Sequence, residues 1–200
     1  ADGVSLKDIP GLVYREENDG EIRRNVPGDW IKDLDVLPMP AWDLFNIKEY
    51  IPYASRLMAK RAPVSFFETT RGCVFLCNYC ASKTTLGRLL RKKSVDRVIE
   101  EIKYMKSFGF REFFIVDDLF TTDVDRTKEI CRRMISENLD FAWQCQNGIR
   151  VDAGDQEMFD LMKRAGCYKV AFGFESGNDD VLKGFGKGGK ATIQRAFETV

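Results

Sequence analysis

Residues 63–80 read PVSFFETTRGCVFLCNYC. The first eight of these residues form an apolar run that predicts a buried strand. Three cysteines, Cys73, Cys77 and Cys80, then follow with the spacing C-x3-C-x2-C. Because they come directly after the strand, on a loop at its carboxyl end, their thiolates can converge on one metal centre.

Downstream of this stretch the pattern alternates between strand and helix. Further strands are predicted at 111–118, 140–147 and 167–176, and helices at 94–107, 123–138, 155–165 and from 191 onward. The connections are long enough for right-handed crossovers, which place successive strands parallel to one another. We therefore expect an α/β fold, a partial parallel (β/α) barrel with four βα units. The pattern stops inside a unit, so we expect a piece of a longer polypeptide.

The chain upstream of residue 64 has a different character. Residues 10–25 contain two short β-like runs around Asn18-Asp19-Gly20, a turn signal that predicts a hairpin. Residues 26–63 carry repeated prolines with aromatic residues between them. Proline removes a backbone donor and favours extended conformations, so this segment is interpreted as a linker arm that inserts aromatic side chains into a surface. We expect an arm at 1–63 and a core domain at 64–200.

Composition narrows the possible functions. The chain has 200 residues, 44% of them hydrophobic, and its 31 Lys and Arg balance its 31 Asp and Glu. This excludes intrinsic disorder and gives no global attraction to nucleic acid or an acidic membrane. No apolar run is long enough to span a membrane, and six cysteines without a disulfide pattern indicate an intracellular, cytoplasmic location. The absence of histidine removes the commonest general base and metal ligand.

The three clustered cysteines favour an iron–sulfur centre. Thiolates at such short spacings hold iron–sulfur clusters, and three local ligands leave one iron of a [4Fe–4S] cube open. A structural zinc normally takes four ligands, often in two C-x2-C pairs. Zinc binding and unligated thiols remain as alternatives. The other cysteines, Cys131, Cys145 and Cys167, are isolated and are predicted to be small buried apolar residues.

Thr70-Arg71-Gly72-Cys73, the C-x3-C-x2-C spacing and the aromatic Tyr79 before the last cysteine resemble the radical S-adenosylmethionine (SAM) superfamily. The resemblance covers about 64–200 and implies the first four units of a six-unit partial barrel. It implies that Cys73, Cys77 and Cys80 ligate three irons of a [4Fe–4S] cluster whose fourth iron binds SAM. In that family, one-electron cleavage of SAM yields a 5′-deoxyadenosyl radical that abstracts hydrogen from a substrate. A small-molecule substrate and a low-potential electron donor such as flavodoxin or ferredoxin are implied partners.

The resemblance also implies roles for residues in the first two units. Tyr79 corresponds to a residue that packs near the adenine of SAM, although ordinary packing explains it as well. Where the family often has Gly-Gly-Glu, this chain has Asp117 and Asp118. A carboxylate there can accept hydrogen bonds from the SAM amino group, and Asp117 has the more favourable position. The alternative is that Asp118 or Thr122 caps the next helix.

The resemblance also implies roles for residues after the third and fourth predicted strands. Arg150, within Asn147–Asp152, is expected to pair with the SAM carboxylate, or else to be an ordinary surface arginine. Glu175 or Ser176, at the end of the fourth strand, is expected to bond the ribose hydroxyls, or else to belong to a helix start.

Two basic stretches are interpreted as loop or surface features. Residues 184–190, GFGKGGK, match a phosphate loop, but the Ser or Thr that holds magnesium is replaced by Ala191. A flexible basic loop at the mouth of the site is the better interpretation. The basic residues at 88–93 predict a solvated face, or a docking surface for an acidic substrate or an electron donor.

The arm at 10–53, with DLDVLPMPAWDLF at 33–45, resembles the linker before the core in cobalamin-dependent members of the superfamily. This implies an upstream cobalamin domain in the parent protein, and methyl transfer or ring modification as its reaction. One alternative is a methylthiotransferase, which would want three further cysteines upstream, and none precedes Cys73. The other alternative is a non-catalytic iron–sulfur or zinc scaffold.

Overall fold

The apolar run before the cysteines forms β3 (Val64–Phe67), the edge strand of a four-stranded sheet. The computed structural model describes residues 4–53, 58–150, 154–187, 194 and 198. Its contacts divide the chain into two units, residues 1–32 and residues 33–200. In the first unit, β1 (Val13–Arg15) and β2 (Ile22–Arg24) pair antiparallel, which confirms the predicted hairpin. A short 3-10 helix, η1 (Leu6–Asp8), precedes them.

The sheet of the second unit is parallel throughout, in the order β3-β6-β7-β8. The other three strands are β6 (Glu112–Ile115), β7 (Ala142–Ile149) and β8 (Cys167–Phe172). All four strands fall within the stretches predicted for them or overlap them closely. Successive strands are neighbours, as right-handed βα units require. The described sheet is open, with β3 and β8 at its edges, and it accounts for the four predicted units of a partial barrel.

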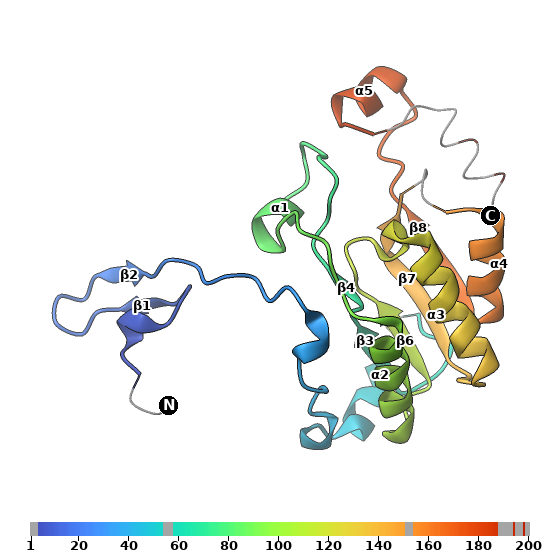
Figure 1. Cartoon of the computed structure of the whole chain (residues 1–200), viewed down its shortest axis with the longest axis horizontal. Helices are drawn as coiled ribbons and strands as arrows, with labels where there is room; N and C mark the ends of the chain where they lie inside the picture. Colours follow the sequence, from blue (N-terminus) through green and yellow to red (C-terminus); the bar gives the residue numbers. More distant parts are fainter. Residues whose placement is uncertain (1–3, 54–57, 151–153, 188–193, 195–197, 199–200) are drawn as a thin grey trace. The chain divides into compact units, whose positions relative to one another are not determined.

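Three helices lie side by side along one face of this sheet (Figure 1). They are α2 (Val95–Ser107), α3 (Val124–Ser136) and α4 (Gln156–Arg164). Each is capped by a side chain, from Ser94, Asp123 and Asp155 respectively, that accepts the N–H three residues further on. The predicted helix from 191 lies outside the described residues, apart from 194 and 198. No helix in the described ranges has the length and apolar character needed to cross a membrane.

The core between helices and sheet combines aliphatic, Met and Cys side chains with a group of aromatic rings. Phe113 on β6 packs edge-on against Phe67 at 5.3 Å and stacks on Trp143 at 5.9 Å between ring centroids. Trp143 is buried, and its indole N–H donates to the carbonyl of Ala165 at 2.9 Å. Burying such a ring fully contributes about 1.5–3 kcal/mol.

The arm joins the same unit from residue 33 onward, whereas the sequence placed its boundary at residue 63. Its turns are η2 (Leu34–Val36), η3 (Trp42–Leu44) and η4 (Ile47–Tyr53). Leu34 is fully buried, and the Trp42 ring meets Phe110 edge-on at 5.0 Å. Asp35 accepts the N–H of Ser94 at 2.9 Å, which fastens the arm to the start of α2. The arm therefore inserts apolar side chains, as expected, but it does so as part of the folded unit.

A polar cluster holds the amino-terminal end of the sheet. The buried carboxylate of Glu112 accepts the N–H groups of Lys60 and Arg61 at 2.8 and 2.7 Å. Its other oxygen accepts the Tyr168 hydroxyl and the Gln144 amide. Polar groups at this end of parallel strands serve stability rather than chemistry, so the opposite end is where a site is expected.

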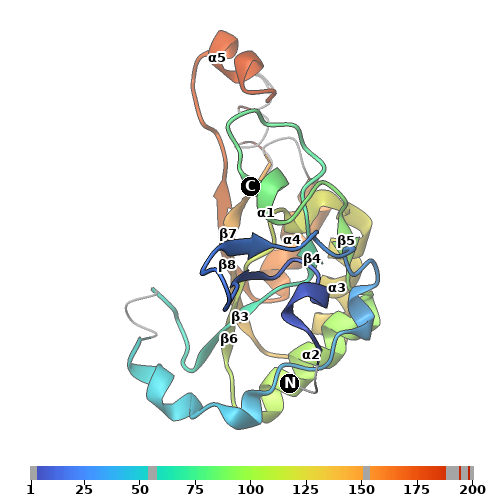
Figure 2. The ribbon, with the colours of Figure 1, turned by 90° about the vertical axis from the view of Figure 1, so that its left-hand side faces the viewer.

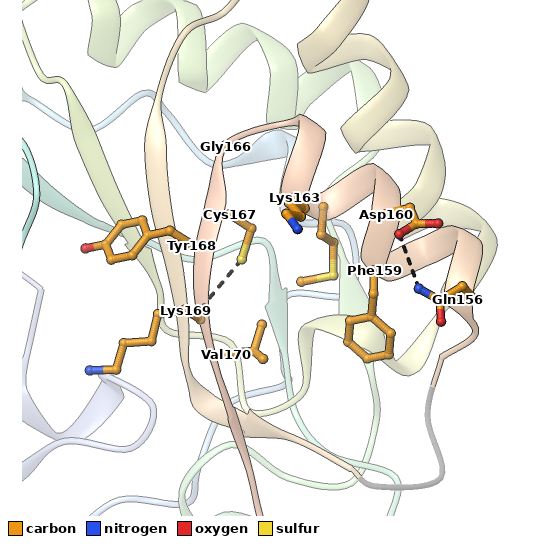
Figure 3. A pocket seen from close by; sticks show the side chains of 10 residues that line it. Gln156, Phe159, Asp160, Lys163, Gly166, Cys167, Tyr168, Lys169 and Val170 are labelled. Atoms are coloured by element: carbon orange, nitrogen blue, oxygen red, sulfur yellow. Dashed lines mark hydrogen bonds between the residues drawn. The ribbon is translucent and has the colours of Figure 1, made fainter. Parts of the chain in front are cut away.

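A groove of about 520 Å³ runs between α4 and the outer edge of β8 (Figure 3). Phe159 and Lys163 line it from the helix, and Cys167 and Val170 line it from the strand. The groove follows the length of β8 and contains none of the predicted site residues.

Candidate active site

The three clustered cysteines lie on a loop that a short two-stranded stem closes. Thr70–Arg71 (β4) pairs antiparallel with Arg91–Lys92 (β5). The N–H of Cys73 donates to the carbonyl of Gly87 at 3.3 Å and extends this pairing. We call residues 72–90 the cysteine loop and β4–β5 its stem. The loop begins at the carboxyl end of β3, as the sequence predicted, and Figure 2 shows its short helix α1 (Ser82–Thr85) at the same end of the sheet as α5 (Asp179–Gly184).

The loop thiols are partly exposed and lie close enough to influence one another. Burial raises the pKa of Cys73, and the charges of Asp118, Cys80 and Cys77 raise it further. The Cys80 sulfur accepts the N–H of Ser82 at 3.4 Å. Within the described ranges no three Cys, Asp or Glu side chains stand in a metal-binding arrangement. Three accessible thiols on one short loop are nevertheless a donor set that suits an iron–sulfur cluster.

The remaining cysteines are buried, whereas the loop cysteines are partly exposed. Cys131, Cys145 and Cys167 are buried in the core, which confirms that they act as small apolar residues. Burial raises the pKa of both Cys131 and Cys167 to about 12. These core thiols are therefore less ionised than ordinary cysteine thiols.

The two aspartates after β6 have different surroundings. Asp117 is buried, and its carboxylate accepts the N–H and hydroxyl of Thr69 at 2.6 Å each and the hydroxyl of Thr70 at 2.9 Å. Asp118 is only partly buried and accepts the hydroxyl of Ser82 at 2.6 Å. The structure thus places Asp118 beside the cysteines and directs Asp117 to the stem. Three donors already bond the Asp117 carboxylate, whereas Asp118 accepts one hydrogen bond from the cysteine loop.

Arg150 lies across the cysteine loop. Its guanidinium carbon is 3.9 Å from the centroid of the Phe75 ring, a cation–π contact between the end of β7 and the loop. Nearby, the side-chain amide of Asn147 donates to the carbonyl of Val116 at 2.6 Å and joins the ends of β6 and β7. Arg150 is therefore in contact with the cysteine loop. Val151 and Asp152, also singled out from the sequence, lie outside the described residues.

Tyr79 and Glu175 are brought together by a residue that the sequence did not suggest. The ammonium of Lys187 donates to Glu175 Oε1 at 2.7 Å and to the carbonyl of Gly173 at 2.9 Å, and it lies 5.8 Å from the Tyr79 ring centroid. Its hydrogen bond lowers the pKa of Glu175. Glu175 has a φ of +61°, which is uncommon outside glycine and is typical of functional or tightly held positions.

The segment after β8 folds back onto the cysteine loop. The amide of Asn78 donates to the carbonyl of Gly184 at 2.5 Å, and the Phe185 ring meets Tyr79 edge-on at 5.0 Å. The flexible basic loop expected at 184–190 is therefore ordered through Lys187, while the remainder lies outside the described residues. Ser176 accepts the N–H of Asn178 at 3.0 Å, in the turn that leads into α5, so the alternative of a helix-start residue suits it better.

The basic stretch at 88–93 is not the solvated face that the sequence predicted. Arg91 and Lys93 are buried. Arg91 donates to the carbonyl of Leu86 at 2.8 Å, and Lys93 pairs with Glu101 of α2 at 2.6 Å. Lys92 pairs with Asp123 at 2.6 Å. These cations tie β5 to the cysteine loop through Leu86, to α2 through Glu101 and to the start of α3 through Asp123.

The fold and the site together define a class. A parallel α/β sheet carries, at its carboxyl edge, three accessible thiols on one loop, with acidic and basic groups from the neighbouring strands around them. Residues 67–200 match the family described as the radical SAM superfamily, and this match covers more than half of the chain. The chain belongs to that superfamily.

Individual relatives agree with this assignment. The chain is 34% identical over 199 residues to an uncharacterized methyltransferase of Pyrococcus horikoshii, a match that covers 99% of this chain and 40% of the relative. Its fold resembles the cobalamin-dependent SAM radical enzyme OxsB, solved with aqua-cobalamin and SAM bound, with a TM-score of 0.73 and 22% identity over 98% of this chain and 28% of OxsB. It also resembles the radical SAM methyltransferase TsrM of Kitasatospora setae, solved with cobalamin and a [4Fe–4S] cluster, with a TM-score of 0.61 and 18% identity over 68% of this chain and 28% of TsrM. The chain spans less than half the length of each of these proteins.

Proposed function

We propose that this chain is the SAM-cleaving core of a radical SAM enzyme, in which Cys73, Cys77 and Cys80 ligate three irons of a [4Fe–4S] cluster and leave the fourth for SAM. The observation that carries the proposal is the presence of three accessible thiols on one loop at the carboxyl edge of a parallel sheet, with Asp118, which follows β6, bonded to Ser82 of that loop. When bound, the cluster supplies the electron that cleaves SAM to methionine and a 5′-deoxyadenosyl radical, which abstracts hydrogen from a substrate. The protein contributes positioning and the exclusion of water.

The groups around the loop suit the functional groups of SAM. Asp118 is the carboxylate nearest the cysteines and suits the SAM amino group, since Ser82 bonds only one of its two oxygens. Arg150 suits the SAM carboxylate, because a guanidinium can bind a carboxylate through two parallel hydrogen bonds. Glu175 suits the ribose hydroxyls, and Tyr79 suits the face of the adenine. The two latter residues already lie together around Lys187.

Cobalamin-dependent methyl transfer is the reaction we favour for the parent protein. The support is the methyltransferase name of the Pyrococcus relative and the cobalamin bound in OxsB and TsrM. The packed arm at 33–45 agrees with it, because the likeness to OxsB extends over 98% of this chain and so includes the arm. The methyl acceptor would be a small molecule, with flavodoxin or ferredoxin as the electron donor and the cytoplasm as the location.

The direct test is anaerobic reconstitution with iron and sulfide, followed by electron paramagnetic resonance of the reduced protein with and without SAM. We expect a [4Fe–4S] signal that shifts when SAM is added. The signal should vanish in the triple variant Cys73→Ala, Cys77→Ala, Cys80→Ala and persist in Cys131→Ala, whose thiol lies in the core. A cluster that ignores SAM, or tight zinc binding with no cluster, would instead support the non-catalytic scaffold.

A methylthiotransferase remains the enzymatic alternative. Product analysis separates it from methyl transfer, because a methylthio group adds sulfur to the product and a methyl group does not. It would also require a second cluster, so iron content near eight per chain in the parent protein would favour it.

A further inference from the structure

Asp117 is a buried carboxylate that the proposed binding of SAM does not use. It projects from the end of β6 to the first residues of the stem, where Thr69 and Thr70 give it three hydrogen bonds of 2.6–2.9 Å. Both threonines are buried as well. The carboxylate is therefore fixed on the exact stretch of chain that leaves the sheet and leads to Cys73.

Arg126, on the first turn of α3, holds the same stretch from the other side. Its guanidinium donates twice to the carbonyl of Lys93, at 2.8 and 3.1 Å, and also to the carbonyl of Thr69 at 3.3 Å. It is half-buried and lies within electrostatic reach of Asp117. One cation thus joins the two strands of the stem, since Thr69 enters β4 and Lys93 follows β5.

Asp118, the residue after Asp117, fixes the other end of the cysteine motif. Asp118 bonds Ser82, two residues after Cys80, while Asp117 bonds Thr69 and Thr70, the latter three residues before Cys73. Two consecutive carboxylates at the end of one strand therefore hold the entrance and the exit of the cysteine motif. The span between those points limits how closely the three thiols can approach one another.

We propose that Asp117 and Arg126 are positioning residues for the cysteine loop, which fix its stem so that Cys73, Cys77 and Cys80 converge on one metal centre. This inference rests on the proposed function, since it names what holds the cluster ligands in place. It also reassigns Asp117 from a SAM contact to a support. Supporting groups behind metal ligands typically change metal affinity about 10- to 100-fold when they are removed.

The test compares Asp117→Asn and Arg126→Met with a variant damaged elsewhere in the core. Asp117→Asn keeps the side-chain volume but removes the charge and one acceptor. Met162→Ala on α4 is the matched control, because Met162 is buried on a helix that packs mainly against α3 and β8. After anaerobic reconstitution, the rate of iron release to a chelator is measured for each protein, alongside its thermal unfolding.

We expect iron release about 10- to 100-fold faster from Asp117→Asn and Arg126→Met, and at the wild-type rate from Met162→Ala even where its melting temperature falls as far. Wild-type release from the two stem variants, or equal acceleration in Met162→Ala, would overturn the inference. If Asp117→Asn does not fold, Thr70→Val removes a single hydrogen bond from the carboxylate, and the same comparison applies with a smaller acceleration.

A second probe separates this inference from the proposed function. Cobalt(II) binds thiolates with a charge-transfer absorbance that needs no cluster assembly, so its affinity reports the convergence of the thiols alone. If the wild type takes up no cluster, the proposed function fails, and weaker cobalt binding in the stem variants than in Met162→Ala still supports the inference. Equal cobalt affinity in all variants, or no cobalt binding by the wild type, overturns it.

Discussion

Gly72 is the residue that most tightly limits the stem of the cysteine loop. Its φ is +92°, and a Cβ placed there would lie 2.4 Å from the carbonyl oxygen of Leu89 and 3.3 Å from that of Gly87. Both obstacles are backbone atoms of the cysteine loop just before β5, so neither can move aside alone. Gly72→Ala must therefore separate the two sides of the stem.

The loss of unfolding free energy in Gly72→Ala has two parts, and a matched variant, Gly109→Ala, separates them. The left-handed conformation costs a non-glycine residue about 1–2 kcal/mol. Gly109 has a similar φ of +86° but nothing within 4 Å of its added Cβ, so Gly109→Ala carries only that cost. Gly72→Ala also forfeits the Cys73–Gly87 hydrogen bond and the neighbouring β4–β5 pairing, each worth about 0.5–1.5 kcal/mol. We expect about 1–2 kcal/mol for Gly109→Ala and about 2–5 kcal/mol for Gly72→Ala.

Urea unfolding, followed by far-ultraviolet circular dichroism and tryptophan fluorescence, measures both free energies. Iron retention after reconstitution should fall in Gly72→Ala alone, because only that variant moves the backbone that leads to Cys73. A difference of less than about 0.5 kcal/mol between the two variants, together with equal iron retention, would refute the reasoning.

Three further perturbations have defined outcomes. Trp143→Ala should lower the free energy of unfolding by about 3–5 kcal/mol, because it leaves a cavity among the core rings and removes the indole donor of the Ala165 carbonyl. A loss below about 1.5 kcal/mol, measured by urea unfolding, would contradict the packing described. Native alkylation with iodoacetamide near pH 8 should label the three loop thiols well before Cys131 and Cys167, whose pKa of about 12 leaves very little thiolate; comparable labelling in peptide mass spectra would argue against their burial. Lys187→Met should lower the melting temperature near neutral pH. The difference from the wild type should shrink as pH falls below the ordinary Glu pKa of 4.5, because Lys187 lowers the pKa of Glu175 and Glu175 stabilises the folded state through this pair only while ionised. A constant difference across this pH range would exclude the Lys187–Glu175 pair as the source of the stability.

Much of this architecture follows from periodicity and spacing. The helices begin at Ser94, Asp123 and Asp155 because each side chain caps the helix that follows it, and such local chemistry is visible in the sequence. The cysteine motif is equally local, since three thiols within eight residues must share one loop. The strands were found because each is a short apolar run between turn signals.

The parts that were missed depend on contacts between distant segments. Whether Asp117 or Asp118 faces the cysteines depends on where β6 ends and how the chain turns, and a sequence of adjacent aspartates does not reveal it. The burial of Lys93 depends on how α2 packs against the stem, because the Glu101 carboxylate of α2 pairs with the Lys93 ammonium. Lys187 was interpreted as part of a flexible loop because its partners, Gly173 and Glu175, belong to the end of β8.

The two adjacent aspartates couple the cysteine loop to the alignment of the sheet. Successive side chains in extended chain point to opposite sides, so a slip of one residue in the pairing of β6 with β3 would exchange the directions of Asp117 and Asp118. The entrance and the exit of the cysteine motif would then lose their anchors together. Insertions within residues 83–90 leave these anchors intact, whereas a single insertion between Glu112 and Asp117 displaces both. The tolerance of the loop to changes in length is therefore set by a strand that contains none of its cysteines.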